Sequence, residues 1–159
     1  MLYCHRMTIA THTAVGTVIG LSVGNPLLGF VIGFISHYLL DLIPHGDGKI
    51  SDQLRVFKKK KMPITYGTID AITSIFLLLI ILNISPEAHT KVFSAAVAGS
   101  ILPDLLTGLY DLTKVRFLRV FYRLHFFFHD YFIKRWHDVN LSYSLIIQVI
   151  FIVCVLAWL

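Results

Sequence analysis

Histidine and aspartate residues occur at helical spacing inside the apolar stretches of this sequence. His37 and Asp41 are four residues apart, so in a helix both project from one face and can offer an imidazole and a carboxylate to a common ion. Asp104 and Asp111 lie about two helical turns apart and also share a face. An imidazole and a carboxylate at the spacing of His37 and Asp41 are typical of metal binding.

Further ionisable groups fall at a similar depth when positions are counted outward from the turns in the chain. Asn25-Pro26 breaks the first apolar region into an antiparallel pair, because proline removes a backbone donor. A second turn is expected at 84–87, and each arm of a helical hairpin advances about 1.5 Å per residue. By this count the groups of similar depth are His12 and His37 across the first turn, and Asp70 and Asp104 across the second.

Burying carboxylates in an apolar environment is costly unless a cation neutralises them, and no Lys or Arg is expected at this depth. A bound divalent metal, zinc first and manganese or magnesium as alternatives, is therefore the expected cofactor. We predict that the ligands are His12, His37, Asp41 and Asp104, with His45, Asp47 and His125 as further candidates. Asp70 and His129 are the candidate general bases or ligands of a second metal.

The segment 114–138 is predicted to be an amphipathic helix lying on the cytoplasmic membrane surface. Charged residues occupy one of its faces, whereas His125 and His129 fall on the opposite, aromatic-rich face. In such a helix the two histidines would point inward and cover the metal site from below.

These residues belong to a chain whose composition favours a membrane protein: 56% of its 159 residues are hydrophobic and 14% are charged. Several apolar runs approach the roughly 20 residues that are needed to cross the hydrocarbon layer. The sequence therefore predicts a single all-α domain, a polytopic bundle of about five transmembrane helices arranged as two antiparallel hairpins and a C-terminal span. The spans are expected near 8–23, 26–43, 66–83, 91–111 and 141–159.

Glycines at every fourth position, Gly16, Gly20 and Gly24 in the first arm and Gly29 and Gly33 in the second, predict close helix packing.

Positive charge is distributed unevenly along the chain. Lys and Arg concentrate in the loop 44–62 and the segment 114–138, and Lys91 alone falls on the other side of the expected bundle. By the positive-inside rule the N-terminus is expected to be cytoplasmic and the C-terminus external. The lipid bilayer is then the partner of the chain, and no nucleic acid is expected because topology accounts for the basic loops.

Three short stretches resemble motifs of the small inner-membrane proteins called membrane-bound metal-dependent hydrolases. They are Thr11-His12-Thr13, Ser36-His37-Tyr38-Leu39-Leu40-Asp41 and Leu102-Pro103-Asp104. The resemblance implies a prokaryotic inner-membrane location and a distant similarity to zinc-dependent phospholipase C. Better-known members carry a Pro-Asp-x-Asp element, whereas two leucines follow Asp104 here.

The expected function is metal-dependent hydrolysis of a phosphoester or related bond in a phospholipid or another lipid-linked substrate at the cytoplasmic face. Two alternatives from other classes stay open at this point. One is a transporter in which the same polar groups bind an ion or proton. The other is a scaffold whose polar cluster only fixes helix packing. The oligomeric state is not determined by the sequence.

Overall fold

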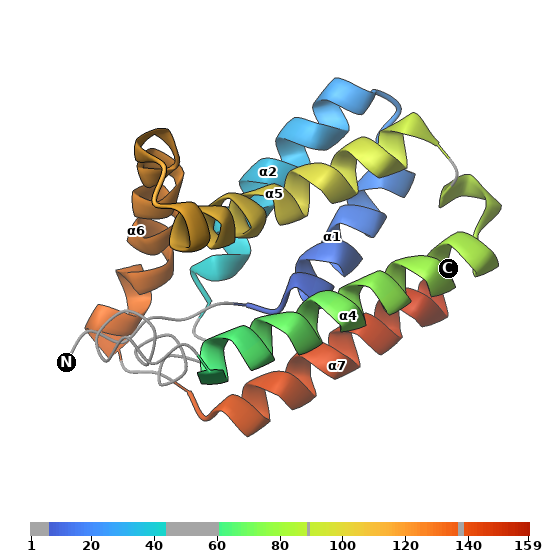
Figure 1. Cartoon of the computed structure of the whole chain (residues 1–159). Helices are drawn as coiled ribbons and strands as arrows, with labels where there is room; N and C mark the ends of the chain where they lie inside the picture. Colours follow the sequence, from blue (N-terminus) through green and yellow to red (C-terminus); the bar gives the residue numbers. More distant parts are fainter. Residues whose placement is uncertain (1–6, 44–60, 89, 137–138) are drawn as a thin grey trace.

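The computed structural model describes residues 7–43, 61–88, 90–136 and 139–159, and within these ranges the chain is helical with no β-strand (Figure 1). The prediction of an all-α fold is thus confirmed. The α-helices are α1 (Ile9–Ser22), α2 (Pro26–Asp41), α4 (Lys61–Ile84), α5 (Lys91–Thr113), α6 (Arg119–Trp136) and α7 (Leu141–Trp158). Short 3-10 helices, η1 (Pro86–Ala88) and η2 (Arg116–Leu118), precede α5 and α6.

Side-chain caps explain where four of the helices begin. Thr8, Asn25, Thr90 and Asn140 each accept a hydrogen bond from a backbone N–H in the first turn of the helix that follows. These residue types are favoured at this position because the first N–H groups of a helix have no partner within it. The caps place the helix starts within one residue of the predicted starts of four spans.

Helix α5 packs closely against both α1 and α2, along the glycine positions that the sequence singled out. A Cβ atom built on Gly16 would lie 2.9 Å from the Cα of Val97. A Cβ atom on Gly33 would overlap the carbonyl oxygen of Ala96. Only residues without a side chain permit this approach, so the predicted close packing is confirmed, and it lies mainly between each arm of the first hairpin and α5.

Helices α4 and α5 do not form the packed hairpin predicted for the third and fourth spans. They are joined through η1, yet α4 packs against α1, while α5 packs on the other side of α1 and against α2 (Figure 1). The glycines of α1 and α2 allow the backbone of α5 to pack closely against both helices, and in this position α5 is separated from α4. Helix α7 also contacts α1 and completes the bundle.

Three helical stretches are long and apolar enough to cross a membrane: Ile64–Ile84, Lys91–Thr113 and Leu141–Trp158. Helices α1 and α2 are apolar but have 14 and 16 residues, fewer than the roughly 20 that a full span requires. Large apolar side chains cover much of the outside, including Leu27, Phe76 and Ile147, which are 73%, 62% and 66% exposed. The protein thus presents a lipid-compatible surface, and the five-span topology stays a prediction.

The predicted continuous helix over 114–138 is interrupted at its start. Lys114 adopts a left-handed conformation with φ 56° and ends α5, and η2 then leads into α6. Helix α6 leaves the direction of α5 and packs against α5 and α2 (Figure 1). The change of direction at Lys114 is what brings α6 over the end of the bundle.

The start of α1 is held by side chains from α4 and α7. The carboxylate of Asp70 accepts hydrogen bonds from the backbone N–H of Ile9 at 2.8 Å and of Ala10 at 3.3 Å. The Oε1 atom of Gln148 accepts from the Thr8 N–H at 3.0 Å and the Thr11 hydroxyl at 3.0 Å. A carboxylate at this position is favourable because it satisfies unpaired donors and faces the positive end of the helix dipole.

Replacing Gly33 tests the close approach of α2 and α5. We expect Gly33→Ala to destabilise the protein by about 1–3 kcal/mol, because the new methyl group meets backbone that cannot move aside locally. Thermal unfolding in detergent measures the loss. Gly108→Ala on α5 is the control, since its Cβ would meet no atom within 4 Å; it should leave stability unchanged or raise it slightly. Equal effects of both substitutions would contradict the packing described.

Replacing Asp70 tests its capping role against a role as general base or ligand. We expect Asp70→Ala to lower stability by about 1.5–3 kcal/mol, because N–H groups at the start of α1 lose a charged acceptor. Asp70→Asn keeps one acceptor oxygen and should lose less. If the asparagine variant instead abolished metal binding at unchanged stability, capping would not be the main role of Asp70.

Candidate metal site

Six buried histidine and aspartate side chains from four helices converge at the end of the bundle where α1 begins. Five of them are 0% exposed and Asp104 is 5% exposed. Helices α1 and α2 run in opposite directions, so the start of one and the end of the other lie at the same level. The residues are His12 from α1, His37 and Asp41 from α2, Asp104 from α5, and His125 and His129 from α6.

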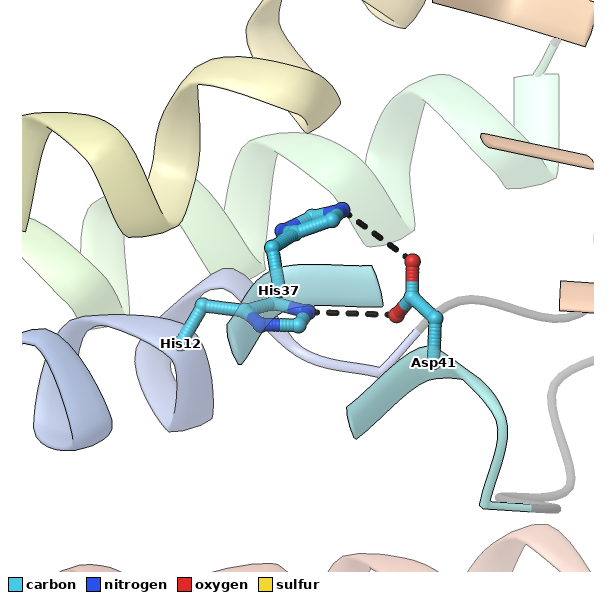
Figure 2. A group of neighbouring side chains, drawn as sticks. All are labelled: His12, His37 and Asp41. Atoms are coloured by element: carbon cyan, nitrogen blue, oxygen red, sulfur yellow. Dashed lines mark ion pairs between the residues drawn. The ribbon is translucent and has the colours of Figure 1, made fainter. Parts of the chain in front are cut away.

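Asp41 lies at the centre of the group and faces three imidazoles. Its Oδ1 is 3.2 Å from Nε2 of His12, and its Oδ2 is 3.1 Å from Nε2 of His37 (Figure 2). The same Oδ2 is 3.4 Å from Nδ1 of His125. A carboxylate this deeply buried must be compensated by positive charge, which a protonated histidine or a bound cation can supply.

His37 is oriented by a backbone carbonyl of the neighbouring helix. Its Nδ1 lies 2.8 Å from the carbonyl oxygen of Ser100, an acceptor only, so this nitrogen carries the proton of the donated hydrogen bond. In the neutral ring Nε2 then presents its lone pair toward Asp41 and His125. Metal-binding histidines are typically fixed in this way, with the second nitrogen donating to a carbonyl or carboxylate.

The spacing of these atoms fits ligands on a shared ion. Ligand atoms at about 2.0–2.2 Å from zinc are about 3.0–3.5 Å apart when they are neighbours in its coordination shell. The contacts of Asp41 with His12, His37 and His125 fall at 3.1–3.4 Å. Within the described part of the chain, the side-chain oxygens of Asp41 and Asp104 and both nitrogens of His12 make no contact with hydrogen-bond geometry. Buried polar atoms in this state can take an ion or a water molecule as a further partner.

The ligand atoms fall into three overlapping groups, and the members of each lie within 4.8 Å of one another. Imidazole and carboxylate ligands without thiolates suit zinc or manganese, whereas magnesium prefers an all-oxygen shell. These buried residues could therefore hold a divalent transition metal. The groups are His12, His37 and Asp41; His37, Asp104 and His125; and Asp41, His125 and His129.

Helix α6 turns its histidines inward, as the sequence predicted. His125 and His129 are one helical turn apart, and Phe126 beside them is also buried. The Nε2 atom of His125 lies 3.8 Å from Oδ1 of Asp104, so this histidine faces Asp41 on one side and Asp104 on the other. The arginines Arg119 and Arg123 occupy an exposed face of the same helix.

The structure brings some of the predicted site residues together and places others elsewhere. His12, His37, Asp41, Asp104 and His125 are brought together, with His129 beside them, although their role as ligands stays a prediction. Asp70 belongs to none of the three groups, and the contacts described for it are with the start of α1. His45 and Asp47 lie outside the described residues.

Sequence reasoning missed Ser100, because it acts through its backbone carbonyl and its residue type carries no signal. Tyr38 was also missed. It is 6% exposed, and its ring contacts that of His37 with centroids 5.4 Å apart. Its position directly after His37 is the one signal that could have identified it.

Comparison with known proteins identifies no relative of this chain. No protein-family model, curated protein or solved structure matches the chain. The arrangement of the six buried residues is therefore the basis on which a function can be argued.

Proposed function

We propose that this chain is an integral membrane protein that binds a divalent metal, zinc or manganese, and hydrolyses a phosphoester or related bond of a lipid-associated substrate. The observation that carries the proposal is the convergence of six buried histidine and aspartate side chains from four helices. Such a set is costly to bury without a cation, and the spacing around Asp41 fits shared ligands.

Location at the cytoplasmic membrane face is part of the proposal. Three helices long enough to span, and exposed apolar side chains around the bundle, support a membrane location. The loop 44–62 and the segment 114–138, which carry most of the basic residues, connect to the helix ends nearest the cluster. By the positive-inside rule this end is cytoplasmic. In this arrangement the bundle comprises five spans, with α1 and α2 shorter than the others.

Hydrolysis is proposed from what a metal does in such a site and from the resemblance of its motifs to membrane-bound metal-dependent hydrolases. A divalent ion held there would polarise the scissile group and lower the pKa of a bound water. His12, His37, Asp41 and Asp104 would hold it, and the carbonyl of Ser100 would keep His37 in the binding tautomer. His129 is the better candidate for accepting the water proton, because Asp70 is engaged with the start of α1.

Basic residues on the outer face of the helix that carries two candidate ligands could bind the phosphate of a lipid headgroup at the membrane surface. Arg119 and Arg123 are exposed on α6, the helix that carries His125 and His129. Arginine binds phosphate oxygens through paired N–H donors. A helix at the membrane surface with this arrangement favours a substrate whose charged head lies at the interface and whose apolar part stays in the lipid.

The described half of the bundle opposite the cluster favours an enzyme over a transporter. Its core is mainly apolar and includes Leu77, Ile81 and Phe93, and the polar side chains buried there, such as Thr17 and Ser85, carry no charge. Conduction requires polar groups or water along the whole path. A site with polar groups at one end suits a reaction at one membrane face.

Metal analysis tests the proposal first. We expect detergent-purified, untagged protein to carry near-stoichiometric zinc or manganese by plasma mass spectrometry after gel filtration, and His37→Ala and Asp104→Ala to lose it. Asp111→Asn is the matched control on α5, because Asp111 pairs with Lys114 at 3.0 Å at the helix end; it should keep the metal. Well-folded wild-type protein without metal would reject the proposal. A scaffold role would then be indicated if Asp41→Asn kept or raised the stability.

Hydrolysis is tested in mixed micelles that contain phospholipid phosphoesters, with product release followed by phosphorus NMR. We expect turnover that a chelator removes and zinc or manganese restores, and a loss of at least about 100-fold in kcat for His129→Ala as general base. Asp111→Asn should retain activity. Turnover that persisted in the presence of the chelator would contradict a metal-dependent reaction.

A further inference from the structure

The six side chains of the cluster are spread too far apart for one ion to bind them all, and their arrangement divides them into two sets. We propose that it holds two divalent ions bridged by the carboxylate of Asp41. This inference rests on the proposed function, because it requires that the cluster binds metal at all. It specifies the number of ions and assigns each histidine to one of two positions. His129 is then a ligand of the second ion and no longer the general base.

Distance limits how many of the six side chains one ion can bind. Ligand atoms on opposite sides of an ion are about 4.0–4.4 Å apart, twice the usual metal–ligand distance. Among the described residues, no group of ligand atoms within 4.8 Å of one another contains more than three of them. A single ion would thus leave several buried imidazoles or carboxylates outside its shell.

The three groups overlap in a way that defines two positions. His12 and His129 share no group, whereas Asp41 belongs to a group with each of them. One position is therefore formed by His12, His37 and Asp41. The other is formed by His125, His129 and Asp41, and Asp104 borders it through its 3.8 Å approach to His125.

The orientation of Asp41 is that of a bridging ligand. Its Oδ1 faces His12 at 3.2 Å, and its Oδ2 faces His125 at 3.4 Å. His37 lies between the two positions, because its Nε2 is 3.1 Å from the same Oδ2. A carboxylate that binds one ion through each oxygen fits ions about 3.5–4 Å apart, the separation found in two-metal phosphatases and nucleases. A bridging carboxylate gives each of its two buried oxygens an ion, whereas a carboxylate that binds one ion through one oxygen leaves the other oxygen to the imidazoles alone.

The charge of two ions also favours a substrate with a negatively charged group. Two divalent ions exceed the negative charge of Asp41 and Asp104, the carboxylates in the described cluster. A buried excess of positive charge is unfavourable until an anion enters. A phosphate group supplies that charge and can place an oxygen on each ion, so the two-ion arrangement favours phosphoesters over uncharged esters or amides.

Manganese loading of untagged protein tests the inference without relying on variants. We expect two ions per chain by plasma mass spectrometry, and an electron paramagnetic resonance spectrum of exchange-coupled Mn²⁺. Titration up to two equivalents should change the spectrum from that of isolated Mn²⁺ to that of a coupled pair as the second position fills. One uncoupled ion per chain would reject the pair and leave the proposed function standing. No bound manganese and no bound zinc would reject both.

Two variants assign the ions to their positions: His129→Ala and His12→Ala should each retain one ion and change the spectrum to that of isolated Mn²⁺. A third variant, Asp41→Asn, removes the bridging carboxylate and should abolish the coupling between the ions. Circular dichroism and gel filtration confirm that the variants are folded, and Asp111→Asn should keep both ions. Retention of two coupled ions in His129→Ala would overturn the assignment of the second position.

Discussion

The burial of Asp41 is the constraint on which the rest of this site depends. A carboxylate that is 0% exposed inside an apolar bundle loses its hydration, and three imidazoles within 3.4 Å of its oxygens replace water. Histidine can carry positive charge or present a lone pair, so these neighbours stabilise the carboxylate either by protonation or through a shared ion. The ligand atoms of His12, His37 and Asp41 also lie close enough together to hold such an ion.

Close helix packing fixes the positions of the ligands relative to one another. Gly16 and Gly33 let α5 approach α1 and α2 at backbone distance, and this contact brings the carbonyl of Ser100 to His37. A bulkier residue at either glycine would move α5 outward and with it Asp104, one turn beyond Ser100. Stability of the bundle and geometry of the site therefore depend on the same contacts.

The two ends of the bundle differ in chemistry because different helices meet there. At one end α6 crosses α5 and α2, and Asp70 and Gln148 hold the start of α1 one turn before His12. At the other end apolar residues such as Ile81 and Phe93 fill the core. The buried cluster of histidine and aspartate side chains and the apolar core therefore lie at opposite ends of the bundle.

The sequence by itself determined the helical class, most helix starts, and the pairing of His37 with Asp41, because capping, apolar runs and i to i+4 spacing are local properties. It also identified the inward face of α6, since amphipathicity is read along one helix. Only the tertiary structure decided that α5, and not α4, lies in the groove of α1 and α2, so that Asp104 joins the cluster while Asp70 caps α1. Depth counting treated these two aspartates alike; packing between helices separates them, because it depends on which small-residue surfaces fit together.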